Sequence, residues 1–486
     1  MSISFNSIPV GVLTPGSYVE VDGTKAVGGI FRDTHKNLII GQRLSTGSVA
    51  EGVPTRLTNI AQAEEFFGRG SQIAHMLKAF FAVNDSQETW AIALDDDGAA
   101  VAATGSITLG GTVTGSGTLN LMVAGQSVKV GVKAADATAD IATAIATAIN
   151  AQTDLPVTAV AAASVVTLTA RNGGESGNDI DVRYNYYTGE TLPKGLTVTV
   201  VAMSGGTANP DIATAISAFG SAHYHTIVTP YTDSANLTAI DTEMETRFTG
   251  TDQRQGTVYT AFKGTFTEAS TFLGNQNSKH LVVLALPDVP EMPCVWASKA
   301  AGVVSYHQTI DPARPYQTLD LNLLAPALGD DFAENEREQL LKAGGATFNV
   351  VSGQVQIQRM VTTYKTNSSG LADPSYRDLN TLHTLAFIRF SMRAMVSTTF
   401  PRYKLANNGT RFAPGQAIVT PNIIYDKLVA HFRLLERQGI VEGVNDWKKD
   451  MIVERNADDV NRIDVQVPAN IVNQLRVFAG QVQFRL

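Results

Sequence analysis

The sequence predicts a multidomain protein of mixed α/β and α+β class. It would have a mainly parallel α/β core with a small inserted α+β domain, an α+β C-terminal domain and extended terminal arms. At 486 residues the chain exceeds one compact core, so about two to four domains are expected. Strand-like apolar runs alternate with helical patterns, as in parallel sheets covered by helices. A charge-poor stretch rich in Ala, Thr, Gly and Ser interrupts this alternation between about Gly98 and Gly206.

The N-terminal part predicts an arm followed by the start of the core. Residues 1–22 hold short apolar pieces around prolines and end in the strand-like SYVEV, which favours an extended arm. The first part of the core α/β domain covers 23–97. In it NLII and TWAIAL have the pattern of strands, and TNIAQAEEFFG and SQIAHMLKAFFAV that of helices.

Residues 98–206 predict a small α+β domain inserted into a loop of the core. GTLNLMVAGQSVKVGV favours a hairpin that turns at Ala124-Gly125, and ADATADIATAIATAINA favours one Ala-rich helix. ASVVTLTARN and GLTVTVVAM add strands. A disordered linker is the alternative, but the hydrophobic periodicity is too regular for it.

The α/β pattern resumes in 207–346, the second part of the core. HTIVTP, TVYTAF and HLVVLAL predict strands, and NPDIATAISAF, SANLTAIDTEMETRF, EASTFLG and ENEREQLLKAGG predict helices. A C-terminal domain is expected over 347–467. It would start with a hairpin around Ser352-Gly353 and hold two long helices, one from about Asp378 to Ser397 and one after Thr420-Pro421. Ile424, Leu428, Phe432 and Leu435 would form the buried face of the second helix.

The last segment, 468–486, predicts a C-terminal arm. Its final residues alternate apolar and polar side chains, which is typical of a strand with one buried face. A terminal strand has to pair with something already folded, either in the same chain or in a neighbour.

Composition favours a soluble cytosolic protein. The single cysteine, Cys294, allows no internal disulfide, the first residues lack the pattern of a secretory signal, and the apolar runs are too short to cross a bilayer. The net charge of −8 argues against nucleic acid as the main partner. Residues 351–486 carry a net +6 and the remainder −14, so the C-terminal third could face an acidic partner, although uneven surface charge explains the count equally well.

A search for catalytic or ligand-binding motifs returns little. The sequence has no phosphate-binding P-loop, no G-x-S-x-G elbow and no dinucleotide-binding glycine fingerprint. His223 and His225 could form half of a metal site, but no further ligand is spaced nearby and a structural role is favoured. Asp95-Asp96-Asp97 could ligate a hard cation, yet a solvated turn is favoured. Trp90 and Trp296 lie in apolar context and predict core positions.

An α/β serine hydrolase with an inserted lid domain is the catalytic alternative. Serines are plentiful, but no local signature singles one out, and a triad is recognised by geometry. We therefore predict no enzyme, and neither a cofactor nor a metal.

The chain resembles the contractile tail sheath proteins of Mu-like myophages nearly from end to end. The similarity lies in long and idiosyncratic strings: IPVGVLTPGSYVEVD, GNDIDVR, the surroundings of PYTD, DPARPYQTLDL, VTTYKTNSSGLADPSYRDLNTLHTL, FPRYKLANNGTRFAPGQAIVTP, LLERQGIVEG and VERNADDVNR. Sequence does not separate a phage tail from a phage-derived bacteriocin or a secretion apparatus.

This resemblance implies a structural function. Sheath subunits stack as hexameric rings around an inner tube and contract to drive that tube through the bacterial envelope. Other sheath subunits, the inner tail tube protein, the baseplate and the tail terminator would be the partners, without direct nucleic-acid binding or membrane insertion. The protein would be assembled in the host bacterial cytoplasm and reside in the virion.

The resemblance also implies where subunits join. In this family both terminal arms add strands to sheets of neighbouring subunits. The N-terminal arm residues would be Ser17, Tyr18, Val19, Glu20 and Val21, and the C-terminal ones Gln481, Val482, Gln483, Phe484, Arg485 and Leu486. In this family the C-terminal domain lies nearest the tube. We therefore hypothesise that five basic residues of this domain face the tube: Arg389, Arg393, Lys427, Arg433 and Arg437.

Overall fold

The computed structural model describes residues 14, 16, 17, 34–413 and 415–485. They divide into two compact units. The first, here called the central unit, is Thr34–Phe387 together with Ile471–Leu486. The second, here called the C-terminal unit, is Ile388–Asn470. The predicted N-terminal arm, residues 1–22, lies outside the described residues except for Thr14, Gly16 and Ser17, and of its proposed strand residues only Ser17 is described.

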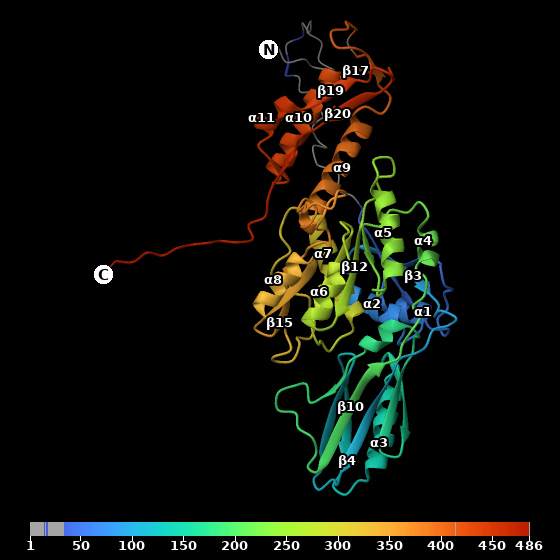
Figure 1. Cartoon of the computed structure of the whole chain (residues 1–486). Coiled ribbons are helices and arrows are strands. Elements are labelled where there is room, and N and C mark those ends of the chain that lie inside the picture. Colours follow the sequence, from blue (N-terminus) through green and yellow to red (C-terminus); the bar gives the residue numbers. More distant parts are fainter. Residues whose placement is uncertain (1–13, 15, 18–33, 414, 486) are drawn as a thin grey trace. The chain divides into compact units, whose positions relative to one another are not determined.

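The central unit is built on one eight-stranded sheet (Figure 1). Six neighbouring strands, from β3 to β14, run parallel, and an antiparallel strand closes each edge. The strands in spatial order are β15 (Gln354–Arg359), β14 (Gly345–Val351), β13 (Leu281–Leu286), β12 (Thr257–Lys263), β11 (Thr226–Val228), β1 (Lys36–Gln42), β3 (Glu88–Leu94) and β2 (Thr55–Leu57). The predicted mixed α/β multidomain class is confirmed.

Helices cover both faces of this sheet. Successive side chains of β1 point to opposite faces of the sheet. Ile39 packs in one hydrophobic core cluster, and Leu38 and Ile40 pack in the other. The first cluster takes side chains from α1 (Ile60–Phe67), α2 (Gln72–Phe81) and α7 (Pro293–Ile310). The second takes them from α4 (Ala213–Phe219), α5 (Ser234–Phe248), α6 (Phe266–Gly274) and α8 (Glu334–Lys342). Since both faces are covered, strands such as β13 are buried along their whole length.

Local sequence signals set the helix starts. Ser71 accepts a hydrogen bond from the amide of Ala74 and so caps α2, and Asp233 caps α5 through the amide of Asn236. Thr265 and Glu268 form a capping box at α6. These interactions satisfy amides that the first helical turn leaves without partners.

The placement of the 345–359 hairpin corrects a prediction. The hairpin forms as expected, with Ser352 and Gly353 at positive φ in its turn. It does not begin a separate C-terminal domain at residue 347, because β14 pairs in parallel with β13 and extends the central sheet. A local pattern shows that two strands pair with each other but not which sheet they join.

The inserted region folds as two antiparallel sheets and one helix, with α3 visible beside β4 and β10 in Figure 1. The predicted turn is present, with Ala124 and Gly125 at positive φ. The larger sheet has the order β10 (Leu196–Ser204), β4 (Thr104–Gly111), β8 (Val165–Ala170) and β7 (Val157–Ala162). The remaining elements are β6 (Gln126–Val132), β5 (Gly117–Val123) and β9 (Val182–Tyr184) in the second sheet, α3 (Thr138–Ala151) and the 3₁₀ helix η2 (Glu175–Asp179).

The C-terminal unit contains the second half of α9 (Leu379–Thr399) and α10 (Pro421–Arg437). Thr420 caps α10 as predicted. Leu428, Phe432 and Leu435 of α10 are buried, and Ile424 only partly. The short elements are β16 (Lys404–Leu405), β17 (Ile418–Val419), β18 (Val441–Glu442), α11 (Val444–Trp447), η3 (Lys448–Asp450), β19 (Ile452–Arg455), β20 (Ile463–Gln466) and β21 (Asn470–Ile471).

Candidate assembly interfaces

The carboxyl edge of the central sheet, where doubly wound folds bind ligands, is occupied by the inserted domain. Asp96 follows β3, and its carboxylate accepts hydrogen bonds from Asn172 Nδ2 (3.0 Å), from the Gly173 amide (2.7 Å) and from Gln42 Nε2 (2.7 Å). The Asn172 side chain in turn accepts from the amide of Gln72 over 3.0 Å. The acidic turn therefore has a structural role, linking two parts of the central unit.

An ion-pair network forms a second link at the same edge. Lys263 ends β12 and lies 3.1 Å from Asp288, which follows β13. Arg183 of β9 contacts both Asp181 (2.8 Å) and Asp288 (3.1 Å). With these two links, the inserted domain lies on the edge that a hydrolase would need open to its substrate.

The described residues also give no support to serine catalysis. A Ser–His hydrogen bond does occur, between Ser391 Oγ and His431 Nε2 at 3.1 Å, but both side chains are buried between α9 and α10. Ser391 is further bonded to the carbonyl of Ile388. In the part of the chain that the structure describes, no carboxylate is hydrogen-bonded to His431, so this pair is a packing contact.

The predicted histidine pair belongs to a larger cluster. The ring centroids of His223 and His225 lie 3.9 Å apart, and His35 stacks on His225 at 4.3 Å. Burial, followed by the neighbouring His225, lowers the pKa of His35, and the same two causes lower that of His383 to about 3. Among the described residues, no group of three or more His, Cys, Asp or Glu side chains could hold a metal ion. The structural interpretation of the histidines is therefore favoured.

This cluster lies where the chain leaves the central unit. The unit begins at Thr34, next to His35, and its first segment ends at Phe387, one helical turn after His383. His383 bonds to Tyr316 Oη (2.8 Å) and Thr257 Oγ1 (3.2 Å). Two of the chain's connections to the C-terminal unit are thus fixed at their base by buried polar packing.

The C-terminal arm residues are exposed and unpaired in the described chain. Residues 472–485 form neither helix nor strand, and Figure 1 shows them as an extended red segment. Phe478, Val482 and Phe484 expose 88%, 92% and 81% of their surface. Leu486 lies outside the described residues. Apolar side chains this exposed are available for contact with another chain.

The C-terminal unit offers open strand edges. In the described part of the chain, β19 and β20 pair only with each other, with Ile452 opposite Gln466 at one end of the ladder. Ile452 and Val465 are exposed. A two-stranded hairpin is marginally stable alone, so these edges are suited to accept another strand.

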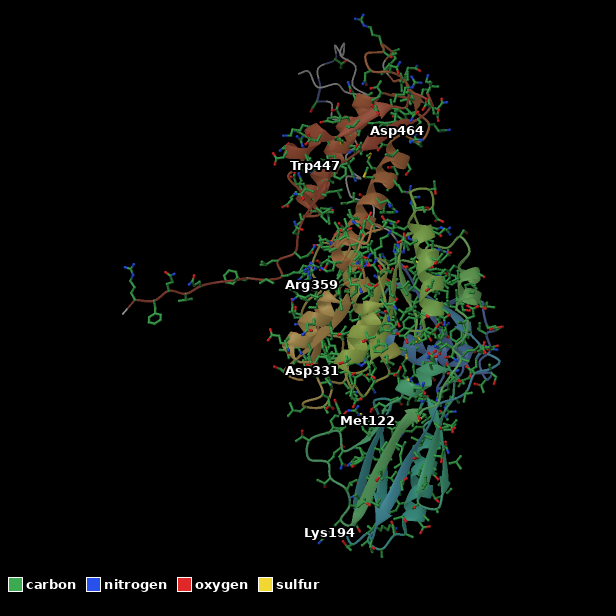
Figure 2. The ribbon with its side chains drawn as sticks, in the orientation of Figure 1. Met122, Lys194, Asp331, Arg359, Trp447 and Asp464 are labelled. Atoms are coloured by element: carbon green, nitrogen blue, oxygen red, sulfur yellow. The ribbon has the colours of Figure 1, made fainter. Side chains whose placement is uncertain are left out.

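The five predicted tube-facing cations lie on the two long helices. Lys427, Arg433 and Arg437 are exposed on α10, whose buried Phe432 packs on Trp447, labelled in Figure 2. Arg433 contacts Asn445 over 3.3 Å. On α9, Arg393 is exposed and Arg389 is half-buried. The structure brings the α10 group to one solvent-facing side.

Sequence reasoning missed several of these features. His35 and His383 are far from the predicted pair in sequence, and no local signal connects them. Arg476 contacts Asp378 (3.3 Å) near the start of α9, which the strand-like tail pattern did not reveal. Trp90, predicted as core, is only partly buried, because its indole lies against Glu88 and Lys36. None of the described helices has the length and apolar character needed to cross a membrane.

A filled ligand edge, an exposed apolar arm and open strand edges are typical of a structural subunit. Comparison with known proteins identifies the family. Residues 97–216, 205–363 and 372–485 match the family models for the phage tail sheath protein beta-sandwich domain, the phage tail sheath protein central domain and the phage tail sheath C-terminal domain.

The chain is 41% identical over 487 residues to the Mu-like prophage FluMu tail sheath protein of Haemophilus influenzae, covering 100% of both. It is also similar to the crystal structure of a sheath tail protein from Desulfitobacterium hafniense, with a TM-score of 0.51, 10% identity, and 95% and 97% of the two chains covered. The contracted helical sheath of the anti-feeding prophage gives a TM-score of 0.48 at 11% identity, covering 97% and 99%.

The chain therefore belongs to the family of phage tail sheath proteins, of the Mu-like type. It is a structural protein and not an enzyme, and the resemblance drawn from its sequence is confirmed.

Proposed function

We propose that the chain assembles as stacked hexameric rings around an inner tail tube and contracts to drive the tube through the bacterial envelope. The observation that carries this proposal is the full-length similarity to a Mu-like tail sheath protein. The protein would be assembled in the host cytoplasm and become part of the virion tail. Its other partners would be the tube protein, the baseplate and the tail terminator.

In this proposal, neighbouring subunits are joined by strand exchange. The C-terminal residues from Gln481 onward, and the N-terminal Ser17 to Val21, add strands to the open edges of β19 and β20 in adjacent subunits. The exposure of Val482 and Phe484 supports this assignment. Burying each would contribute about 1.5–3 kcal/mol, and each backbone hydrogen bond about 1 kcal/mol more. Such arms stay bonded while the bodies rotate during contraction.

The proposal also assigns tasks to the predicted segments. Residues 98–206 would project outward from the core, and the C-terminal unit would include the surface nearest the tube. The exposed Lys427, Arg433 and Arg437, with Arg389 and Arg393, would contact an acidic tube. Exposed ion pairs contribute about 0–1 kcal/mol each, so such a contact can be released collectively.

Electron microscopy of the purified protein tests strand exchange. We expect tubes from the full chain and none from a chain lacking Gly480 to Leu486. Phe484→Asp, which places a charge on the apolar side of the arm, should also abolish tubes. Gln483→Asp, on the opposite side, is the matched control and should retain them. Tubes that survive both the truncation and Phe484→Asp would disprove the arm assignment, and only discrete particles from the full chain would count against self-assembly.

Charge reversal tests the tube contact. Lys427, Arg433 and Arg437 are changed together to Glu, and Arg389 and Arg393 in a second variant. Co-sedimentation with the tube should fall in at least one of the two. Lys129→Glu with Lys133→Glu, on the inserted domain, is the control for a change of net charge. If both charge-reversal variants co-sediment with the tube as well as the control variant does, these cations do not face the tube.

A further inference from the structure

Arg476 is the one charged residue in the described C-terminal segment that is held inside the central unit. Its guanidinium Nη2 lies 3.1 Å from Asn380 Oδ1, 3.3 Å from Asp378 Oδ1 and 3.2 Å from Gln474 Oε1. The side chain is only 13% exposed. Its neighbours Leu475 and Val477 are both exposed, by 75% and 78%. The segment thus turns inward at Arg476 within a largely exposed stretch, and beside it the Leu475 carbonyl accepts a hydrogen bond from Gln317 Nε2 at 3.5 Å.

The groups that receive Arg476 are already fixed in place. The carboxylate of Asp378 takes two hydrogen bonds of 3.0 Å from Arg359, labelled in Figure 2. The amide of Asn380 donates to the carbonyls of Pro312 (3.1 Å) and Arg314 (2.8 Å). Asp378 and Asn380 flank the first residue of α9, so the acceptor pair is rigid before the tail arrives.

Burial of a guanidinium is unfavourable unless it is paired and hydrogen-bonded. Burial lowers the pKa of Arg476, and the Asp378 carboxylate opposes that change. An arginine without a role in this segment would remain in water, as Arg485 does. All three contacts are made by one guanidinium nitrogen, Nη2.

We propose that Arg476 is the anchor of the C-terminal arm, a positioning residue that fixes where the arm leaves its own subunit. This rests on the strand exchange proposed above. The arm then has a free linker of only 477–480, which can span roughly 14 Å when extended. A pull on the arm passes through Arg476 into Asp378 and the start of α9. The load is carried by the central unit and does not reach the connection at 470–471 directly.

Spin-label spectroscopy on the unassembled chain tests the anchor without requiring sheath function. A nitroxide is attached at Asn473→Cys, which lies between β21 and Arg476; Cys294 is buried and stays unlabelled. In Arg476→Ala the mobile component of the spectrum should increase several-fold, and Arg476→Lys should give an intermediate increase. Arg402→Ala, an exposed arginine elsewhere, should leave the spectrum unchanged. Equal spectra for the parent chain and Arg476→Ala would overturn the anchor.

Electron microscopy of assembled tubes gives a second test, independent of the spin-label measurement. Arg476→Ala should still form tubes, because its arm is intact, but these should break into shorter pieces under shear or on contraction. Tubes as resistant as those of the parent would show that the anchor carries no load. If the parent chain forms no tubes, the proposed function fails, while the spin-label result still decides whether Arg476 holds the segment.

Discussion

Tyr316 Oη donates a hydrogen bond to His383 Nδ1 over 2.8 Å, and both side chains are buried. Because Nδ1 is the acceptor, the proton of the neutral ring lies on Nε2, which is 3.2 Å from Thr257 Oγ1. A protonated His383 could not accept from Tyr316. The geometry and the lowered pKa of about 3 therefore agree on a neutral imidazole.

The first prediction is a loss of stability in mild acid. The pKa of His383 is about 3 in the folded chain against about 6.5 unfolded, so the unfolded state binds the extra proton between these values. Stability is complete above pH 6.5 and falls as pH decreases below it. Urea unfolding from pH 7.5 to 5 should show this slope. His383→Gln should reduce the slope of the unfolding free energy against pH by up to about 1.4 kcal/mol per pH unit. Equal slopes would contradict the assignment.

The second prediction concerns Asp179, where the sign is opposite. Burial raises the pKa of this carboxyl to about 6, so its contribution to stability is present below its unfolded pKa near 3.8 and is lost as pH rises through 6. At pH 7 Asp179→Asn should stabilise the chain by about 1–2 kcal/mol, and the gain should vanish below pH 4. Asp85→Asn, at an exposed position, is the control in the same urea titration. A destabilised Asp179→Asn at pH 7 would contradict the prediction.

The third prediction is that Asn150 protects a free sheet edge. From α3 its side chain accepts from the Ala159 amide (2.9 Å) and donates to the Ala159 carbonyl (2.7 Å), at the middle of edge strand β7. Asn150→Ala should lower the free energy of unfolding by about 1–3 kcal/mol and leave an edge open to pairing. Calorimetry and light scattering measure the two effects. Thr147→Ala, one turn earlier on α3, should show neither. Unchanged scattering would remove the protective role.

The fourth prediction compares two glycines. A Cβ on Gly302 of α7 would lie 2.7 Å from Val83 Cγ2, whereas a Cβ on Gly274 of α6 would meet nothing within 4 Å. Gly302→Val should therefore destabilise the central unit by about 1–3 kcal/mol, because α2 and α7 would have to separate. Gly274→Val should change the melting temperature little. Similar effects of the two substitutions would show that α7 has room to move.

Much of the central fold was predictable from the sequence, because the strands that both faces bury appear as apolar runs and the surface helices as amphipathic ones. The hairpin at Ala124-Gly125 was predictable too, since few residues adopt two successive positive φ angles. The family resemblance was recognisable from long and specific stretches of sequence. In each of these cases the pattern that allowed the prediction lies within a few tens of residues.

What was missed depends on residues far apart in the chain. α7 was not predicted because Trp296, Ala300 and Val304 are buried together with most of its other sides, which leaves no polar face to give a helical period. The contact of Arg476 with Asp378 joins positions that only the folded chain brings together. The arms are a different case, because their pairing would need a second subunit.

The base of the inserted domain has one further consequence. Val101 and Thr207 bond to each other through both backbone amides, at 3.1 and 3.2 Å, so the chain enters and leaves the domain through a single narrow neck. Beyond this neck, the domain is held to the sheet edge by side-chain contacts such as those of Asp96 and Asp288. A foreign domain with equally close termini could be grafted at this neck, and a sheath built from such chains would display that domain at every subunit.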